Sequence, residues 1–139
     1  MGIVLDTSVL IAAEKQRFDL EGLFAAYKQE PFFIAAITAA ELLHGVERAS
    51  PGVRRQKRSK YVEWVLSHIE AIDFDLSLAR QHATLWAALE TTGEPIGAHD
   101  LLIAATATQF DHALATLNQA EFKHVAGLRL IDLAPFLRS

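Results

Sequence analysis

Four acidic side chains in this sequence have positions from which they could act together on a metal ion or a phosphate. Each stands where a short apolar run ends or where a predicted helix begins. Open α/β sheets bind ligands beyond the carboxyl ends of their strands. If the apolar runs are parallel strands, the acids therefore meet at one edge of a sheet. They are Asp6, Glu41, Asp100 and Glu121, with Asn118 three residues before the last.

A cluster of carboxylates is costly without a cation, because like charges within a few Å raise one another's pKa and oppose folding. Mg²⁺ and Mn²⁺ prefer oxygen ligands, and one or two such ions would relieve the repulsion. Two ions about 3.5–4 Å apart would stabilise the attacking and leaving oxygens of a phosphodiester displacement. The chain has no cysteine and no His-rich ligand set, which disfavours zinc. It also lacks a nucleophile elbow and a phosphate-cradling Gly-rich loop.

Taken one at a time, the acids also have purely structural interpretations. Asp6 or its neighbour Thr7 could cap the helix that follows the first strand. Thr38 and Glu41 have the spacing of a capping box, T-x-x-E. Asp100 could cap the helix that runs through the apolar stretch LLIAATA. The joint placement of the acids is what favours chemistry over capping.

The hydrophobic pattern predicts strands that alternate with helices. Apolar runs predict buried strands at 2–5 and 32–35, and shorter or mixed segments are strand candidates at 72–74 and 112–117, with an edge strand at 128–133. Helical spacing predicts helices at 9–15, 19–30, 39–49 and 76–90, a further one after the basic segment, and a buried one after Gly97. The segment 119–125 is a short helix or a turn. We therefore expect one α/β domain over 1–139, a three-layer α/β/α sandwich around a mainly parallel sheet of about five short strands.

Length and composition indicate an ordinary globular domain. A chain of 139 residues buries roughly two thirds of its unfolded surface and needs no disulfides. The apolar run at the start lacks a basic n-region and is broken by Asp6 and Glu14, unlike a signal peptide. No run reaches the ~18 apolar residues of a membrane span. We expect a soluble cytoplasmic protein.

Six of the 13 Lys and Arg residues fall between positions 48 and 60, although the formal net charge is −4. This basic segment has two interpretations that composition does not separate. It could be the solvated start of a helix, or it could contact the phosphates of a nucleic acid. The candidate RNA-binding residues are Arg54, Arg55, Lys57, Arg58 and Lys60.

Four stretches, in this order, resemble the successive motifs of PIN-domain ribonucleases, in particular the VapC toxins of toxin–antitoxin pairs. They are LDTSVLI at 5–11, AAELLHGVERA at 39–49, GAHDLLIAATA at 97–107 and TLNQAEF at 116–122. The length of the chain matches as well, so the resemblance covers essentially all of it.

The resemblance implies an α/β/α fold and an endoribonuclease that depends on Mg²⁺ or Mn²⁺. Asp6, Glu41 and Asp100 match the family's acids, and Glu121 matches the acidic position of the last motif. Asn118 stands where some members have Asp, so it is a ligand or a residue that orients water. Thr7 matches the hydroxyl residue beside the first acid.

The resemblance also implies partners. A VapB-type antitoxin would inhibit the enzyme and bind operator DNA, and the toxin would form a homodimer. The substrate would be a structured RNA, tRNA or rRNA. We expect a water activated by the metal to attack the phosphorus in line, which leaves 5′-phosphate and 3′-hydroxyl ends.

Two other functions stay open at this point. One is another Mg²⁺-dependent phosphate-transfer enzyme, although position 8 is Ser where a haloacid-type phosphatase has its second Asp. The other is a PIN-fold RNA-binding or scaffold module without catalysis, which would not require the acids.

Overall fold

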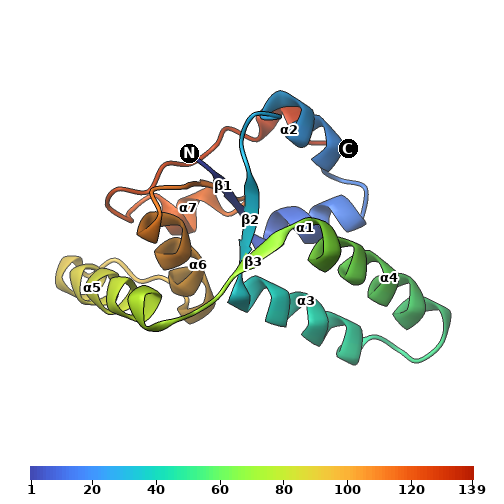
Figure 1. The fold of residues 1–139 in the computed structure, drawn as a ribbon, viewed down its shortest axis with the longest axis horizontal. Coiled ribbons are helices and arrows are strands. Elements are labelled where there is room, and N and C mark those ends of the chain that lie inside the picture. Colours follow the sequence, from blue (N-terminus) through green and yellow to red (C-terminus); the bar gives the residue numbers. More distant parts are fainter.

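A central sheet of four parallel strands organises the molecule (Figure 1). The computed structural model describes all 139 residues. The spatial order of the strands is β3-β2-β1-β4. Their bounds are β1 (Ile3–Leu5), β2 (Phe32–Ala35), β3 (Glu70–Ile72) and β4 (Ala113–Ala115). Because β1 and β4 are adjacent, the start and the last third of the chain meet in the middle of the fold.

Seven α-helices and one short 3₁₀ helix surround the sheet. They are α1 (Thr7–Glu14), α2 (Leu20–Ala26), α3 (Ala36–Arg48), α4 (Val53–His68), α5 (Leu76–Thr92), α6 (Ala98–Gln109), α7 (Gln119–Phe122) and η1 (Ala134–Phe136). Helices α1–α4 lie on one side of the sheet and α5–α7 on the other (Figure 1). No helix combines the length and the apolar character needed to span a bilayer.

The strands supply a hydrophobic core on each face, which confirms the three-layer architecture. Ile3 and Leu5 belong to the core shared with α1–α4. Val4, between them, belongs to the core shared with α5–α7. All three side chains are fully buried. This alternation is the period of two that a strand imposes, and burial on both faces explains the lack of polar residues.

Helix α6 is the most enclosed helix, as its apolar sequence predicts. It packs between α5 and the sheet, and its residues 103–107 are all buried. Both ends of helix α5 are set by residues typical of helix caps. The Asp75 carboxylate accepts a hydrogen bond from the backbone of Leu78, and Gly93 adopts a left-handed conformation at the other end.

The sheet has one strand fewer than expected. In the segment 128–133, only Leu130 forms a bridge, with Leu114 of β4. Two backbone hydrogen bonds flank it, from Leu114 to Arg129 and from Ile131 to Leu114. The chain then turns into η1, where Pro135 cannot donate to a ladder.

Several predicted boundaries were also wrong: α2 ends at Ala26 rather than near position 30, β4 covers only Ala113–Ala115, and β3 begins at Glu70. Strand β3 ends at Ile72 rather than continuing to Phe74. The chain leaves the sheet before Asp75, because Asp75 caps α5. Phe74 is consequently 47 % exposed. Helix α3 begins at Ala36, directly after β2, instead of near position 39.

Candidate active site

Asp6 stands at the carboxyl end of β1 and is 2 % exposed. Its Oδ2 accepts two hydrogen bonds, from Ser8 Oγ at 2.6 Å and from Thr116 Oγ1 at 2.7 Å. The side chain makes no capping bond to α1. Because both donors reach the same oxygen, Oδ1 makes no hydrogen bond within the protein.

Glu41 projects from α3 toward the starts of α1 and α6. Its Oε1 accepts a hydrogen bond of 2.6 Å from Thr7 Oγ1, and its Oε2 lies 3.1 Å from His99 Nδ1. The early start of α3 puts Thr38 inside the helix, so the predicted capping box does not form. Thr38 is buried, and its hydroxyl lies 3.0 Å from that of Thr7.

Asp100 and Glu121 flank the backbone of Gly97. The Gly97 amide donates a 2.9 Å hydrogen bond to Glu121 Oε1. A Cβ atom placed on Gly97 would lie 3.7 Å from that oxygen and 3.8 Å from Asp100 Oδ2. Gly97, not Asp100, is the N-cap of α6, and the Asp100 carboxylate has no hydrogen-bond partner. The capping interpretation of Asp100 was therefore wrong.

The electrostatics of Asp100 show that the four acids converge. Burial, followed by the negative charges of Asp6, Glu121 and Glu41 in that order, raises the pKa of Asp100 from its ordinary value of 3.8 to about 6. His99 acts in the opposite direction. Because the charges of three other acids act on Asp100, the four carboxylates lie near one another, although they come from four different parts of the chain.

The donor set suits a hard divalent cation, because carboxylate oxygens are the ligands that Mg²⁺ and Mn²⁺ prefer. In the arrangement shown, however, no three acidic or histidine side chains come close enough to hold one ion. Glu41 and Glu121 are instead held by hydrogen bonds within the protein. The site thus has the right chemistry, and binding an ion requires the acids to come closer together.

Two other predicted residues have different surroundings. Thr7 lies within the cluster, where its hydroxyl donates to Glu41. Asn118 is exposed, and its side chain makes no hydrogen bond. Its backbone amide donates to Thr116 Oγ1 at 3.0 Å. The structure therefore does not bring the Asn118 side chain into the cluster.

Sequence reasoning missed four residues that hold the acids by hydrogen bonds. These are Ser8, Gly97, His99 and Thr116. Three of them lie close to an acid in the sequence, which is a usable signal. Thr116 is 110 residues from its partner Asp6, and only the pairing of β1 with β4 reveals it.

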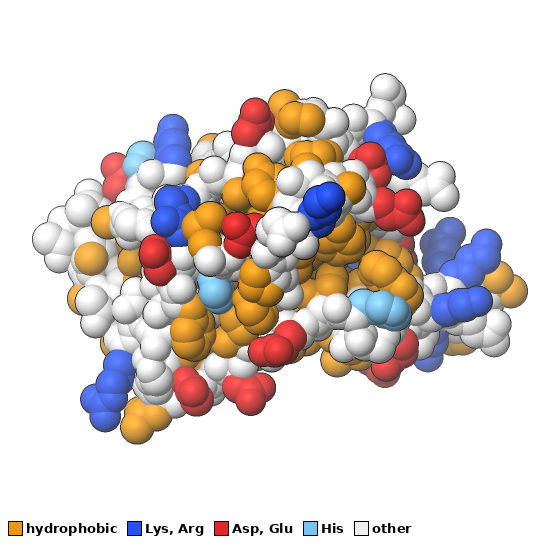
Figure 2. All heavy atoms as spheres, turned by 45° about the horizontal axis from the view of Figure 1, so that its top comes forward, with side chains coloured by type: hydrophobic (Ala, Val, Ile, Leu, Met, Phe, Trp, Pro, Cys, Tyr) orange, Lys and Arg blue, Asp and Glu red, His pale blue; other side chains and the backbone are white.

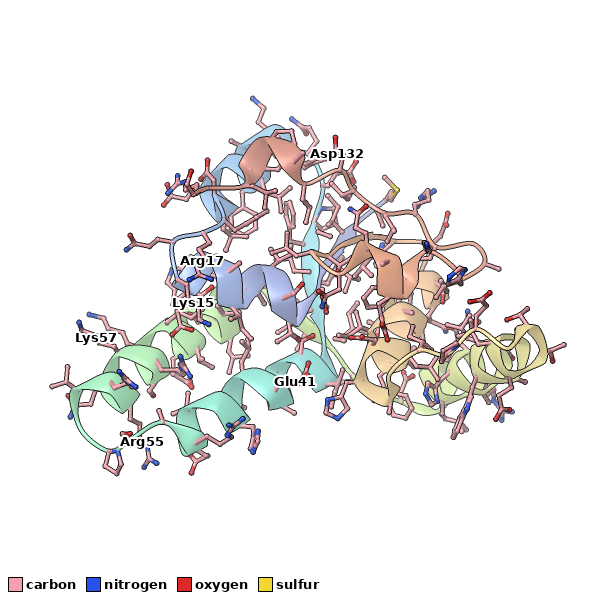
Figure 3. The ribbon with its side chains drawn as sticks, turned by 180° about the vertical axis from the view of Figure 1, so that it is seen from behind. Lys15, Arg17, Glu41, Arg55, Lys57 and Asp132 are labelled. Atoms are coloured by element: carbon pink, nitrogen blue, oxygen red, sulfur yellow. The ribbon has the colours of Figure 1, made fainter.

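The basic segment runs from the end of α3 through the turn into the first half of α4, at the tip of the hairpin that these helices form (Figure 3). Lys and Arg side chains gather at this end of the molecule (Figure 2). Arg55 donates to the backbone oxygens of Ala49, at 3.2 Å, and Glu47, at 2.7 Å. Arg58 pairs with Glu14 at 3.3 Å. Arg54, Lys57 and Lys60 are exposed and form no ion pair. Only part of the predicted RNA-binding set is thus free to meet a ligand.

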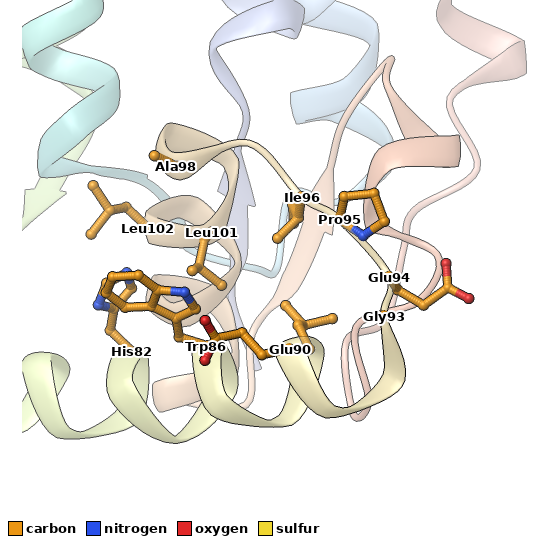
Figure 4. Close-up of a pocket in the computed structure, with 11 residues that line it drawn as sticks. His82, Trp86, Glu90, Gly93, Glu94, Pro95, Ile96, Ala98, Leu101 and Leu102 are labelled. Carbon is orange, nitrogen blue, oxygen red and sulfur yellow. The ribbon is translucent and has the colours of Figure 1, made fainter.

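An apolar cavity lies elsewhere, between α5 and α6 (Figure 4). It has a volume of about 510 Å³, and none of the four clustered acids lines it. Leu101 and Leu102 line one wall, and the Trp86 side chain, 53 % exposed, lies across from them. The cavity is mainly apolar and is therefore not the carboxylate site.

Comparison with known proteins decides the family. The sequence model of the PIN domain matches residues 3–128. Ribonuclease VapC1 of Rickettsia felis is 33 % identical over 134 residues, which cover 96 % of this chain and 98 % of that protein. The chain belongs to the VapC ribonucleases of the PIN-domain family. Nucleases of this family generally depend on divalent metal ions.

Two further VapC relatives extend the comparison. The tRNA(fMet)-specific endonuclease VapC of Shigella flexneri is 29 % identical, over 93 % of this chain and 96 % of its own length. A crystal structure of VapBC2 from Rickettsia felis, bound to a DNA fragment from its promoter, has a TM-score of 0.85 at 30 % identity. It covers 94 % of this chain and 98 % of the matched one.

Proposed function

We propose that this VapC-family chain is a metal-dependent endoribonuclease and the toxin of a toxin–antitoxin pair. The observation that carries the proposal is the placement of four carboxylates from different parts of the chain at one edge of the sheet, where hydrogen bonds hold Asp6, Glu41 and Glu121. The raised pKa of Asp100 is consistent with their proximity. Acids that serve only as helix caps bind the amides of the first turn through their side chains, and none of the side chains of Asp6, Glu41 and Asp100 makes such a capping hydrogen bond.

Asp6, Glu41, Asp100 and Glu121 would hold one or two Mg²⁺ or Mn²⁺ ions. Bound there, the metal supplies Lewis-acid activation of water and neutralises charge on the phosphodiester in the transition state. Among the acids, Asp6 offers its free Oδ1 and Asp100 offers both oxygens without breaking any hydrogen bond. These two are therefore the first ligands that an ion would meet.

The other residues of the cluster would position the acids. Ser8 and Thr116 hold Asp6 through a single oxygen, so that the carboxylate cannot rotate away. Thr7 does the same for Glu41. Asn118, which lies just beyond Thr116, would orient water or a ligand only after a side-chain movement.

The RNA backbone would lie along α3, from the carboxylates to the hairpin tip (Figure 3). Glu41 and Arg48 are seven residues apart on this helix, which is about 10 Å at 1.5 Å per residue. Arg54, Lys57 and Lys60, free of ion pairs, would contact phosphates a few nucleotides from the cleaved bond. Arg55 and Arg58 would support the tip from within.

The partners follow from the relatives. We propose a VapB-type antitoxin as inhibitor, since the matched Rickettsia chain was solved in a VapBC complex on promoter DNA. Operator DNA would be bound through that antitoxin, and the toxin would be a homodimer of one-domain chains. The Shigella relative makes tRNA the first substrate to test.

The experiment is cleavage of total cellular RNA by purified, antitoxin-free protein, with Mg²⁺ and with EDTA. We expect discrete fragments that require the metal, with 5′-phosphate and 3′-hydroxyl ends, and sequencing of those ends identifies the target. A folded protein that binds RNA but does not cut it with any divalent metal would instead favour a non-catalytic RNA-binding module.

A further inference from the structure

Glu41 is held from two sides by residues of two other helices. Thr7, the first residue of α1, binds Oε1 at 2.6 Å, and His99, the second residue of α6, binds Oε2 at 3.1 Å. These partners are 34 and 58 residues away in the sequence. Neither carboxylate oxygen is left to orient itself freely.

The chemistry of the His99 contact defines which nitrogen carries the proton. A carboxylate oxygen only accepts hydrogen bonds, so Nδ1 of His99 must be the donor. The other ring nitrogen, Nε2, has no partner within the protein. The His99 side chain is 58 % exposed and that of Glu41 is 31 % exposed, so the contact lies at the outer edge of the cluster.

An isolated surface contact of this kind contributes little to stability. The His99–Glu41 contact is of interest because of its place beside Asp100. His99 immediately precedes Asp100 in α6, so the first turn of α6 supplies both an acid of the cluster and the donor that fixes the acid on α3. A Glu side chain held only by Thr7 could still turn its second oxygen away from Asp100.

We propose that His99 is a positioning residue that holds the Glu41 carboxylate in the orientation needed to bind a divalent ion. The inference rests on the proposed function, because it assumes that Glu41 is a metal ligand. Side chains that hydrogen-bond a ligating carboxylate fix its orientation, and their loss typically weakens metal affinity about 10–100-fold. His99 itself touches neither the ion nor the reacting atoms.

The test compares three variants of the antitoxin-free protein: His99→Ala, His99→Asn and His99→Gln. The Asn amide nitrogen takes nearly the place of Nδ1, whereas the Gln amide nitrogen lies nearer the place of Nε2. Mn²⁺ affinity is measured by electron paramagnetic resonance without RNA, and the kcat and KM for RNA are measured separately. Circular dichroism melts establish that each variant is folded.

We expect His99→Ala to weaken Mn²⁺ binding about 10–100-fold. His99→Asn should restore it, and His99→Gln should not. The KM for RNA should stay the same at saturating metal. If His99→Ala does not fold, the difference between the Asn and Gln variants still decides the question.

Several results would overturn the inference. These are unchanged Mn²⁺ affinity in His99→Ala, equal affinities in the Asn and Gln variants, or a higher KM with unchanged Mn²⁺ affinity, which would make His99 an RNA contact. Wild-type protein that binds no Mn²⁺ would overturn it as well. Wild-type protein that binds Mn²⁺ but cuts no RNA would contradict only the proposed function.

Discussion

The hydroxyl of Thr116 donates a 2.7 Å hydrogen bond to Oδ2 of Asp6, and both side chains are buried. The two residues follow β4 and β1, which pair in parallel from Ile3–Ala113 to Leu5–Ala115. Strand pairing therefore aligns a hydroxyl with the acid at the sheet edge. Ser8 donates to the same oxygen and accepts from the backbone of Leu117, which completes the support.

Thr116→Val removes this hydroxyl while keeping the shape of the side chain. A hydrogen bond to a charged group contributes about 1.5–3 kcal/mol, so we expect the free energy of unfolding to fall by about that amount. Urea denaturation measures the change. Thr84→Val, on the exposed face of α5, is the matched control and should shift stability by no more than about 0.5 kcal/mol. Equal effects at the two positions would show that Thr116 does not support Asp6.

Asp100→Asn should stabilise the metal-free protein at neutral pH. Burial, followed by the charges of Asp6, Glu121 and Glu41, raises the pKa of Asp100 to about 6, so the folded state binds this proton more tightly than the unfolded state. The favourable contribution of Asp100 is complete below pH 4 and is lost as the pH rises through 6. The variant should therefore gain stability over wild type between these values.

The half-buried position of Asp100 lets solvent screen part of the repulsion, which limits the gain to about 1 kcal/mol, or about 2–5 °C in Tm. Thermal melts of both proteins from pH 3.5 to 8 in EDTA measure the difference. A Tm difference that does not change with pH would contradict the crowding of carboxylates around Asp100.

We expect Arg55 to stabilise the α3–α4 hairpin rather than to bind RNA. Its guanidinium binds two backbone oxygens near the end of α3, Ala49 at 3.2 Å and Glu47 at 2.7 Å. Arg55→Ala should lower the free energy of unfolding by about 1 kcal/mol. Arg55→Lys should recover little, because an ammonium group lacks the planar fork that reaches both oxygens. Full recovery in the Lys variant of the unfolding free energy measured in urea would contradict this role.

Charge reversal at the hairpin tip should weaken RNA binding. The double variant Arg54→Glu, Lys57→Glu removes two exposed cations without breaking an ion pair. The slope of log affinity against log salt should decrease by about 1.5–2, as two phosphate contacts predict. Filter binding to a catalytically inactive variant measures the slope. Arg80→Glu on α5 is the control, and a loss of the same size there would point to general charge repulsion.

Much of the fold could be predicted from local signals. The apolar runs identify β1 and β2 because strands buried on both faces carry no polar residue. Helix α6 is equally clear, since it is apolar over almost its whole length. The acids were predictable because strand ends and helix starts share one edge of a parallel sheet.

The unpredicted features depend on long-range contacts or on competition between local signals. Asp75 could continue a strand or cap a helix, and capping α5 ends β3 two residues early. Thr38 and Glu41 match a capping box, but no break separates β2 from α3, so the helix begins before them. The charge of Arg55 suggests a surface contact, whereas its partners are carbonyl groups across a turn.

A metal site that is formed by the four acids and cuts RNA is tested most directly by measuring Mn²⁺ binding and RNA cleavage together in Asp100→Asn and in Asp73→Asn. Asp73 is exposed and forms no ion pair or hydrogen bond, so it matches the chemical change outside the site. We predict that Asp100→Asn loses both Mn²⁺ binding and RNA cleavage, while Asp73→Asn keeps both. RNA cleavage that persists in a folded Asp100→Asn protein would contradict a catalytic metal site formed by the four acids.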